Sequence, residues 1–437
     1  METEKINKRG AWGVLFLLFL ANLFNFFDRT IPAIIVEPVR KEWSLTDTQL
    51  GVISAVFTIV YAIAGIPLGR LADRLSRKKI IGWGLGVWSA FTALNGIAWN
   101  YMSFLLIRAG VGIGEASYAP AANSMIGDMF KSEKRARAIG IFMLGLPLGL
   151  MLAFFSVGFI IEAFESWRAA FYVAAIPGLI LAIIFFFIRE PERGGMDTVA
   201  HSEGVDKPFR RIMKVKTMWW IILSGLTFNF AAYATNAFMV PMMQRFFHFE
   251  LLDAALATGV IVGITGLLAL TLGGWVADRL HEKFPNGRLA FGTISLLVGS
   301  VLVLLALRLD ATQGALFIGL YSAGWFLCYN YYTTVYPAVQ DVIVPRLRAS
   351  AMALYFAAMY LLGAAVGPVI VGWISDTIAL KHFEGPGSTG SMEFSRGIGL
   401  HDALFTVPIT VLATALFMFL AMRYFVSDAR AMREGRS

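Results

Sequence analysis

Charged residues are scarce in this chain, since Asp, Glu, Lys and Arg make up only 15% of its 437 residues, whereas soluble domains carry about 25%. Cysteine is scarcer still, because Cys328 is alone and no internal disulfide can form. The histidines all fall in expected loops or at their edges, so a proton carrier inside a membrane would have to be a carboxyl group. These shortages exclude a soluble domain and a disulfide scaffold.

The apolar segments also lack nucleophile–histidine pairs and clusters of metal ligands. The glycines of GVGIGEAS follow no strand, so they favour close helix packing over a nucleotide-binding turn. The sequence therefore predicts no enzyme, no metal site and no cofactor.

Long apolar runs are abundant instead, each about 20 residues or more and able to cross a bilayer. No strand-like alternation competes with them, so each is expected to be a helix that satisfies its own backbone groups. The runs are residues 11–36, 47–73, 79–99, 102–129, 135–162, 167–188, 217–244, 252–279, 288–308, 312–343, 347–376 and 402–425.

Basic residues are distributed unevenly among the loops between these runs. The six that fall on one side of the expected membrane are Arg40, Lys41, Arg245, Arg308, Lys381 and Arg396, while most of the 37 Lys and Arg fall on the other. This positive-inside asymmetry places both termini in the cytoplasm. It also explains the net charge of +8 without a nucleic-acid partner.

The chain is expected to consist of two halves joined by a linker. Residues 189–216 are polar and end in a basic stretch, which predicts a cytoplasmic linker between six-helix bundles at 1–188 and 217–437. GRLADRL (69–75) and GWVADRL (274–280) end equivalent runs of the two halves. A parallel six-plus-six repeat is typical of transporters whose bundles rock about a central site.

Small residues provide a weaker sign of the same repeat. GLPLG (145–149) and GAAVGP (363–368) occupy similar places in the two halves. Helix packing alone explains such glycines. It does not explain an acid and a base repeated at one cytoplasmic position.

The loop at residues 69–78 resembles the signature of the major facilitator superfamily, through Gly69, Asp73, Arg74, Arg77 and Lys78. Ser76 stands where the family often has a second glycine. NFFDRTIPAIIVEPV (25–39) and GIGEASYAPAANSMIGDMF (112–130) resemble the Spinster branch, and the resemblance extends over the whole chain. It implies an all-α membrane protein with twelve transmembrane helices in two pseudo-symmetric bundles. It also implies lysophospholipid or sphingosine-1-phosphate-like substrates, proton coupling and a bacterial homologue.

Four ionisable residues lie deep within apolar runs of the first half: Asp28, Arg29, Arg108 and Glu115. A charge at that depth costs at least about 2.5 kcal/mol and usually has a function. We expect a proton-sensitive network, because burial raises a carboxyl pKa and a nearby arginine lowers it. Either arginine could instead bind an anionic head group. Permanent ion pairs between the two helices remain the structural alternative.

A cytoplasmic gate is expected at the repeated ADRL motifs. Asp73 would contact the helix that begins near Arg348, and Asp278 would contact the helix that begins near Arg135 or Arg137, because helix N-termini attract carboxylates. In the alternative interpretation, the cations of this region only fix the topology. The expected gate comprises Gly69, Asp73, Arg74, Arg77, Lys78, Asp278, Arg279 and Arg348.

Aromatic and amide side chains are expected to line a substrate path in both halves, since rings with a polar tip suit an amphiphile. For any single tyrosine, interhelical hydrogen bonding or a place at the membrane interface is the alternative. The expected lining comprises Phe57, Tyr61, Asn229, Tyr233, Asn236, Tyr329, Asn330, Thr333, Tyr355 and Tyr360.

These observations predict a monomeric, proton-coupled secondary transporter that moves a lysolipid-type amphiphile by alternating access. Its partners would be the lipid bilayer, protons and the amphiphile, and its location a bacterial inner membrane. Two alternatives remain open: a proton-coupled organic-anion symporter, and a membrane sensor or receptor that transports nothing.

Overall fold

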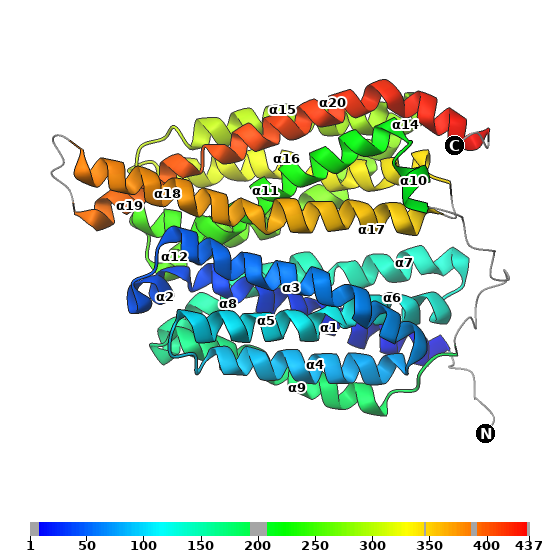
Figure 1. Cartoon of the computed structure of the whole chain (residues 1–437), viewed down its shortest axis with the longest axis horizontal. Coiled ribbons are helices and arrows are strands. Elements are labelled where there is room, and N and C mark those ends of the chain that lie inside the picture. The colour runs from blue at the N-terminus through cyan, green and yellow to red at the C-terminus, as the bar shows by residue number, and fades with distance from the viewer. Residues whose placement is uncertain (1–7, 193–207, 345–346, 386–390, 435–437) are drawn as a thin grey trace. The chain divides into compact units, whose positions relative to one another are not determined.

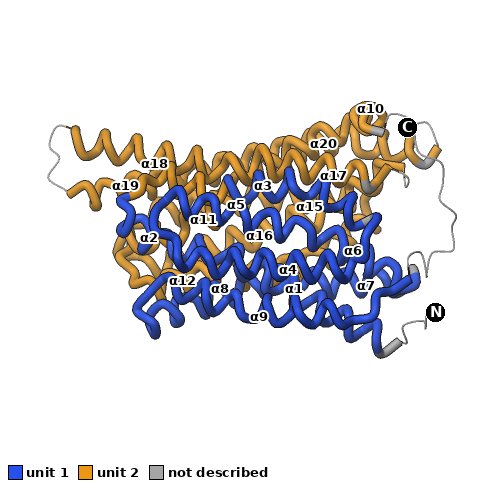
Figure 2. Tube along the Cα trace, turned by 60° about the horizontal axis from the view of Figure 1, so that its bottom comes forward, with its two compact units in different colours: residues 1–44, 56–202 blue, residues 45–55, 203–437 orange. Residues whose placement is uncertain are grey.

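The computed structural model describes residues 8–192, 208–344, 347–385 and 391–434, and every regular element in these ranges is a helix. The chain divides into two compact units, coloured separately in Figure 2. Unit 1 comprises residues 1–44 and 56–202, and unit 2 comprises residues 45–55 and 203–437. The predicted all-α class is confirmed.

The helices of unit 1 are labelled in Figure 1. They are α1 (Lys8–Ile34), α2 (Val36–Trp43), most of α3 (Asp47–Arg74), α4 (Arg77–Asn95), α5 (Tyr101–Ala116), α6 (Tyr118–Met129), α7 (Ser132–Met143), α8 (Gly145–Phe164) and α9 (Trp167–Phe187). The first turns of α3 belong to unit 2.

Unit 2 contains the remaining helices, three of which are π-helical (η) segments. They are α10 (Pro208–Ile212), α11 (Lys216–Arg245), α12 (Leu251–Thr258), η1 (Gly259–Ile264), α13 (Thr265–Leu268), η2 (Ala269–Gly273), α14 (Gly274–Lys283), α15 (Gly287–Ala306), α16 (Gly314–Val342), α17 (Arg348–Ala358), η4 (Met359–Ala364), α18 (Val366–Glu384), α19 (Met392–Ala403) and α20 (Thr406–Arg433).

Each of the twelve predicted spans coincides with one helix or with consecutive helices. In eight of these places, the described helices are long and apolar enough to cross a membrane. They are Gly10–Ile34, Asp47–Ala72, Arg137–Phe164, Trp167–Phe187, Leu251–Lys283, Gly287–Ala306, Ser350–Glu384 and Met392–Met432. The other four predicted spans correspond to α4, to α5 with α6, to α11 and to α16. α20 extends beyond the last predicted span, to Arg433.

Three of the predicted spans are interrupted three residues before a proline. α5 gives way to α6 at Ser117, three residues before Pro120, and α7 gives way to α8 at Leu144, three residues before Pro147. η4 likewise ends next to Ala365, three residues before Pro368. A proline has no N–H to donate and its ring crowds the carbonyl one turn earlier, so the helix is disrupted there.

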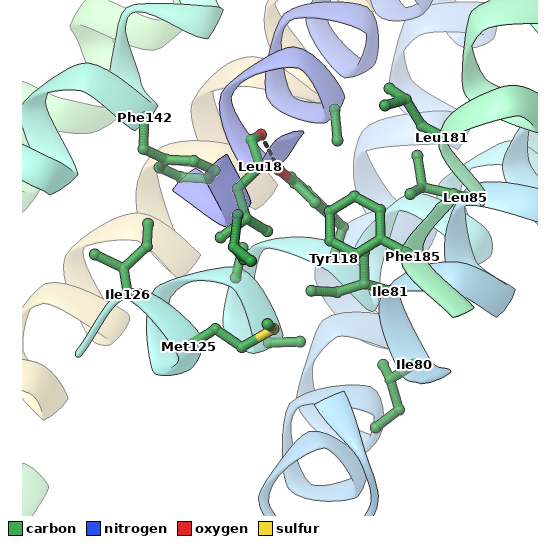
Figure 3. Close-up of a cluster of buried hydrophobic side chains, with 14 of the residues drawn as sticks. Leu18, Ile80, Ile81, Leu85, Tyr118, Met125, Ile126, Phe142, Leu181 and Phe185 are labelled. Atoms are coloured by element: carbon green, nitrogen blue, oxygen red, sulfur yellow. Dashed lines mark hydrogen bonds between the residues drawn. The ribbon is translucent and has the colours of Figure 1, made fainter. Parts of the chain in front are cut away.

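The core of unit 1 lies where α1, α4, α6, α7 and α9 meet. Figure 3 shows Leu18, Leu85, Tyr118, Phe142 and Phe185 converging in this core, and the Tyr118 hydroxyl donates a hydrogen bond to the Leu18 carbonyl. This bond satisfies the hydrogen-bonding need of a hydroxyl group that is buried among apolar side chains.

Glycines bring helices close together in the same way in both units. In unit 1, a Cβ at Gly149 would lie 2.3 Å from the Leu23 carbonyl oxygen, so α8 lies directly against α1. In unit 2, a Cβ at Gly363 would lie 2.4 Å from the Leu226 carbonyl oxygen, so η4 lies directly against α11. The glycines predicted from the repeat therefore serve helix packing.

Candidate functional site

The four deep charges, called here the deep-charge cluster, come together inside unit 1. Arg29 on α1 donates through Nε to the Glu115 carboxylate on α5, with 2.5 Å between Nε and Oε2. The Glu115 side chain is fully buried. The ion pair that the sequence left undetermined is therefore Arg29 with Glu115.

Asp28, adjacent to Arg29 in the sequence, points to a different helix. Its Oδ2 accepts a hydrogen bond of 3.2 Å from Thr92 Oγ1 on α4. Asp28 is 1% exposed, and its Oδ1 has no hydrogen-bond partner within the described ranges. Neighbouring residues of a helix diverge by about 100°, which explains why one turns to α4 and the other to α5.

Arg108 is the buried cation of this cluster whose hydrogen-bonding capacity is not used. Its guanidinium lies 4.9 Å from the Phe57 ring centre, while Nε and Nη1 have no acceptor among the residues described. Arg29 lies 5.1 Å from the same ring and 4.3 Å from the Tyr61 ring. Phe57 and Tyr61 of the expected substrate path are thus stacked on each other and on these cations.

This arrangement suits two kinds of chemistry. A carboxylate held by one arginine can exchange a proton when the pair separates. A buried guanidinium with unused N–H groups can bind a phosphate or carboxylate through two parallel hydrogen bonds. Glu115 is arranged as the first chemistry requires, and Arg108 as the second requires.

Arg77 of the expected gate is buried and joins three segments of unit 1. It pairs with Asp128 at the end of α6 and with Glu190 just after α9, with 3.2 Å between Arg77 Nε and Glu190 Oε1. Burial raises the pKa of Glu190, but hydrogen bonds from Ser76 and Arg77 outweigh it and leave the pKa below its ordinary value. Arg77 is more than a surface charge that fixes topology.

The other gate residues have partners within their own units or are exposed. Asp278 pairs with Arg288, with 2.7 Å between Oδ1 and Nη2, and Arg279 lies over the Trp275 ring. Arg348 donates to the Gln340 and Ile343 carbonyls. Lys78 donates to the Ile188 carbonyl, Arg74 is exposed, and Gly69 lies near Pro120. The Asp73 side chain lies outside what the structure describes, so its latch stays a prediction.

Among the expected lining residues of unit 2, the asparagines show unused polar groups. Asn229 and Asn330 donate to carbonyls one turn earlier, and their Oδ1 atoms have no partner in the described part. Asn236 Oδ1 is also without a partner there. These amides could accept hydrogen bonds from a ligand.

The other lining residues make local contacts. Tyr355 is fully buried and hydrogen-bonds Tyr331, which favours the interhelical alternative for this residue. Tyr233 contacts Tyr360 edge to face, Tyr329 contacts Trp325, and Thr333 donates to the Asn330 carbonyl.

A polar anchor at the start of α3 was not predicted. Asp47 is 2% exposed and accepts hydrogen bonds from Arg245 at 2.8 Å and from Ser375 at 2.6 Å. Asp376 accepts from the backbone N–H of Asp47 and of Thr48. All of these residues belong to unit 2. The sequence signal was an acid at a helix start, but its partners are too distant in sequence to identify.

Comparison with known proteins gives a consistent pattern. The Major Facilitator Superfamily model matches residues 18–378. An MFS-type efflux pump of Mycolicibacterium smegmatis is 28% identical over 396 residues, which are 86% of this chain and 88% of that protein. The zebrafish (Danio rerio) sphingosine-1-phosphate transporter SPNS2 is 26% identical over 442 residues, covering 94% and 84%.

Among solved structures, a bacterial homologue of the human lysosomal transporter Spinster has a similar fold. In its inward-facing, unoccupied form it superimposes with a TM-score of 0.88 at 24% identity, covering 97% of this chain and 99% of that one.

Proposed function

This chain belongs to the major facilitator superfamily as a Spinster-like transporter, and from that premise we propose that it moves a lysolipid-type amphiphile with an anionic head group, coupled to protons. One observation carries the proposal: Arg108 is buried with two unused guanidinium nitrogens beside the Arg29–Glu115 pair. Burying such a group without a partner costs about 1–3 kcal/mol or more. A head-group phosphate would offset that cost.

The coupling step follows from competition for arginine. A bound anion attracts Arg29 as well as Arg108, which weakens the Arg29–Glu115 pair. A buried carboxylate that loses its cation gains affinity for a proton. Substrate and proton would therefore occupy unit 1 together, and the two six-helix bundles would rock to expose them to either side.

Three further features support the proposal. The name of the zebrafish relative states a phosphate-bearing amphiphile as its cargo. The positive-inside charges support a bacterial inner membrane with both termini in the cytoplasm. Phe57 and Tyr61, which stack on the arginines, supply apolar surface next to the charges.

Transport into liposomes tests this function. The purified chain would be reconstituted, a lysophospholipid and a sphingosine-1-phosphate analogue supplied, and flux followed with and without a pH gradient. We expect Asp28→Asn and Glu115→Gln to reduce gradient-driven flux by at least about ten-fold, the equivalent of about 1.4 kcal/mol. Glu162→Gln, which changes an exposed carboxylate at the end of α8, is the matched control.

Three results would count against the proposal. Flux of small carboxylates but of no lysolipid would favour an organic-anion symporter. Absence of flux for every ligand would favour a sensor. Unchanged pH dependence in both variants would remove proton coupling.

A further inference from the structure

α4 presents a buried polar face beside Asp28. Ser89, Thr92 and Asn95 follow one another at intervals of three residues, so they lie along one side of the helix. Each is at most 1% exposed, and Trp88 next to them is fully buried. α4 begins with the basic residues at 77–79, so Asn95 lies at its outer end.

Most polar atoms of this face are unsatisfied. Trp88 Nε1, Ser89 Oγ and Asn95 Oδ1 have no hydrogen-bond partner among the described residues. Asn95 Nδ2 donates only to the Phe91 carbonyl of its own helix. In the described part of the chain, the hydrogen bond from this face to another helix runs from Thr92 to Asp28, and the Trp88 indole also interacts with that carboxylate.

Helix packing alone does not account for these side chains. Polar residues that join membrane helices do so by hydrogen bonds across the interface, and each buried group without such a bond destabilises the fold. Buried polar atoms of this kind typically bind internal water. Gly178 of α9 lets Ser89 approach closely, since a Cβ there would lie 2.0 Å from Ser89 Oγ.

The charged groups around Asp28 are few. Arg29 lies on its own helix, Arg108 and Glu115 lie on α5, and Tyr61 of α3 lies against Arg29. The polar face of α4 contains no ionisable carboxyl or basic group, and the charges of α8 and α9 are confined to their outer ends. A proton that moves along α4 therefore has Asp28 as the nearest acceptor.

We propose that Asn95 and Thr92, with internal water along the Ser89–Asn95 face, form the proton route between the outer end of α4 and Asp28. The step moves one excess proton, which enters as hydronium at the outer end. Each water on the route accepts a proton and gives one up, so one O–H bond forms as another breaks, and the last water returns to neutral as Asp28 is protonated. Asn95 and Thr92 are positioning residues that orient the water. The proposal rests on the proton coupling of the proposed function, but it makes a separate prediction about the rate at which the Asp28 carboxyl exchanges its proton.

Infrared spectroscopy of the full-length protein in lipid tests the route. The Asp28 carboxyl band is identified as the one that Asp28→Asn removes, and its exchange in D₂O is timed. We expect Thr92→Val and Asn95→Leu to slow exchange by at least about ten-fold, since each removes a polar relay. Thr92→Ser, which keeps the hydroxyl, is expected to restore the rate.

Thr293→Val is the matched control. Thr293 is buried like Thr92, but it lies in unit 2 and its hydroxyl donates to the Leu289 carbonyl of its own helix. Thermal unfolding of each variant verifies folding. Unchanged exchange in Thr92→Val and Ser89→Ala overturns the route, as does the absence of an Asp28 carboxyl band at every pH. If the unaltered protein exchanges the Asp28 proton normally but moves no lysolipid, the proposed function is contradicted and the route is not.

Discussion

Arg108 is buried, and its Nε and Nη1 have no hydrogen-bond acceptor in the described part of the chain. Arg108→Lys keeps the charge but removes the planar pair of donors that fits a phosphate. We expect the dissociation constant of a lysophosphatidate to rise by about ten-fold, and that of an uncharged monoacylglycerol to stay the same. Equilibrium binding to purified protein measures both.

The exposed Arg308 provides the control for this prediction. Arg308→Lys should bind both lipids as the unaltered protein does. Equal loss of affinity for the charged and the uncharged lipid would show that Arg108 supports folding rather than the head group.

The sequence identified which charges lie deep in apolar runs but not how they pair. Depth in an apolar run is a property of position along the chain, so Asp28, Arg29, Arg108 and Glu115 could be selected from the sequence alone. Pairing depends on the rotation of each helix about its axis, which is determined by distant contacts. Thr92 was missed for that reason, because a lone threonine in an apolar run gives no signal until Asp28 lies beside it.

At the scale of elements, Glu190 joins the end of α9 to the start of α4. The pKa of Glu190 is lowered in the folded protein, so its charge stabilises the fold at pH values above the pKa of an unfolded glutamate, about 4.3. This stabilisation is lost as the pH falls through the pKa of Glu190 in the folded protein. At neutral pH, Glu190→Gln should therefore reduce the free energy of unfolding by about 1–3 kcal/mol. Unfolding at a series of pH values tests this.

The difference between Glu190→Gln and the unaltered protein should shrink as the solution becomes acidic. Glu192→Gln changes an exposed neighbour two residues away and should have little effect at any pH. A difference that persists in acid would mean that the lost contacts, and not the charge, account for the destabilisation.

The start of α3 is a second element that the structure identifies. Asp376 satisfies two N–H groups of the first turn of α3, a role comparable to that of an N-cap. Asp376→Ala should cost about 1–2 kcal/mol and speed hydrogen exchange in residues 47–55. Asp253→Ala, at the exposed first turn of α12, is the control, and equal exchange in both variants would refute the anchor.

For the whole molecule, the fold was predictable because hydrophobic length and the loop charges are read directly along the chain. The interruptions of the spans could not be predicted from proline alone, since those at η1 and η2 have no proline nearby and Pro67 and Pro177 lie inside unbroken helices. The anchor at Asp47 could not be predicted either, because its partners Arg245 and Asp376 become neighbours only after the helices of unit 2 have packed.

The repeated ADRL motif carries a prediction about the whole molecule. If Asp73 holds the N-terminus of the helix that begins near Arg348, Asp73→Ala removes a helix-dipole interaction of about 1 kcal/mol. The population with the cytoplasmic side open should then rise by about five-fold relative to the closed population. The effect of Asp278→Ala should be smaller, because Arg288 of the same unit already neutralises that exposed carboxylate.

Spin labels on cysteines introduced at the exposed positions Lys131 and Lys283, one in each unit, report this change. A background of Cys328→Ser removes the native thiol. Asp73→Ala should increase the fraction of long distances between the labels. Asp310→Asn changes an exposed acid of the loop between α15 and α16 and should leave the distribution unchanged. An unchanged distribution in Asp73→Ala would mean that the motif fixes topology alone, and an equal shift in Asp278→Ala would mean that both copies act as latches of similar strength.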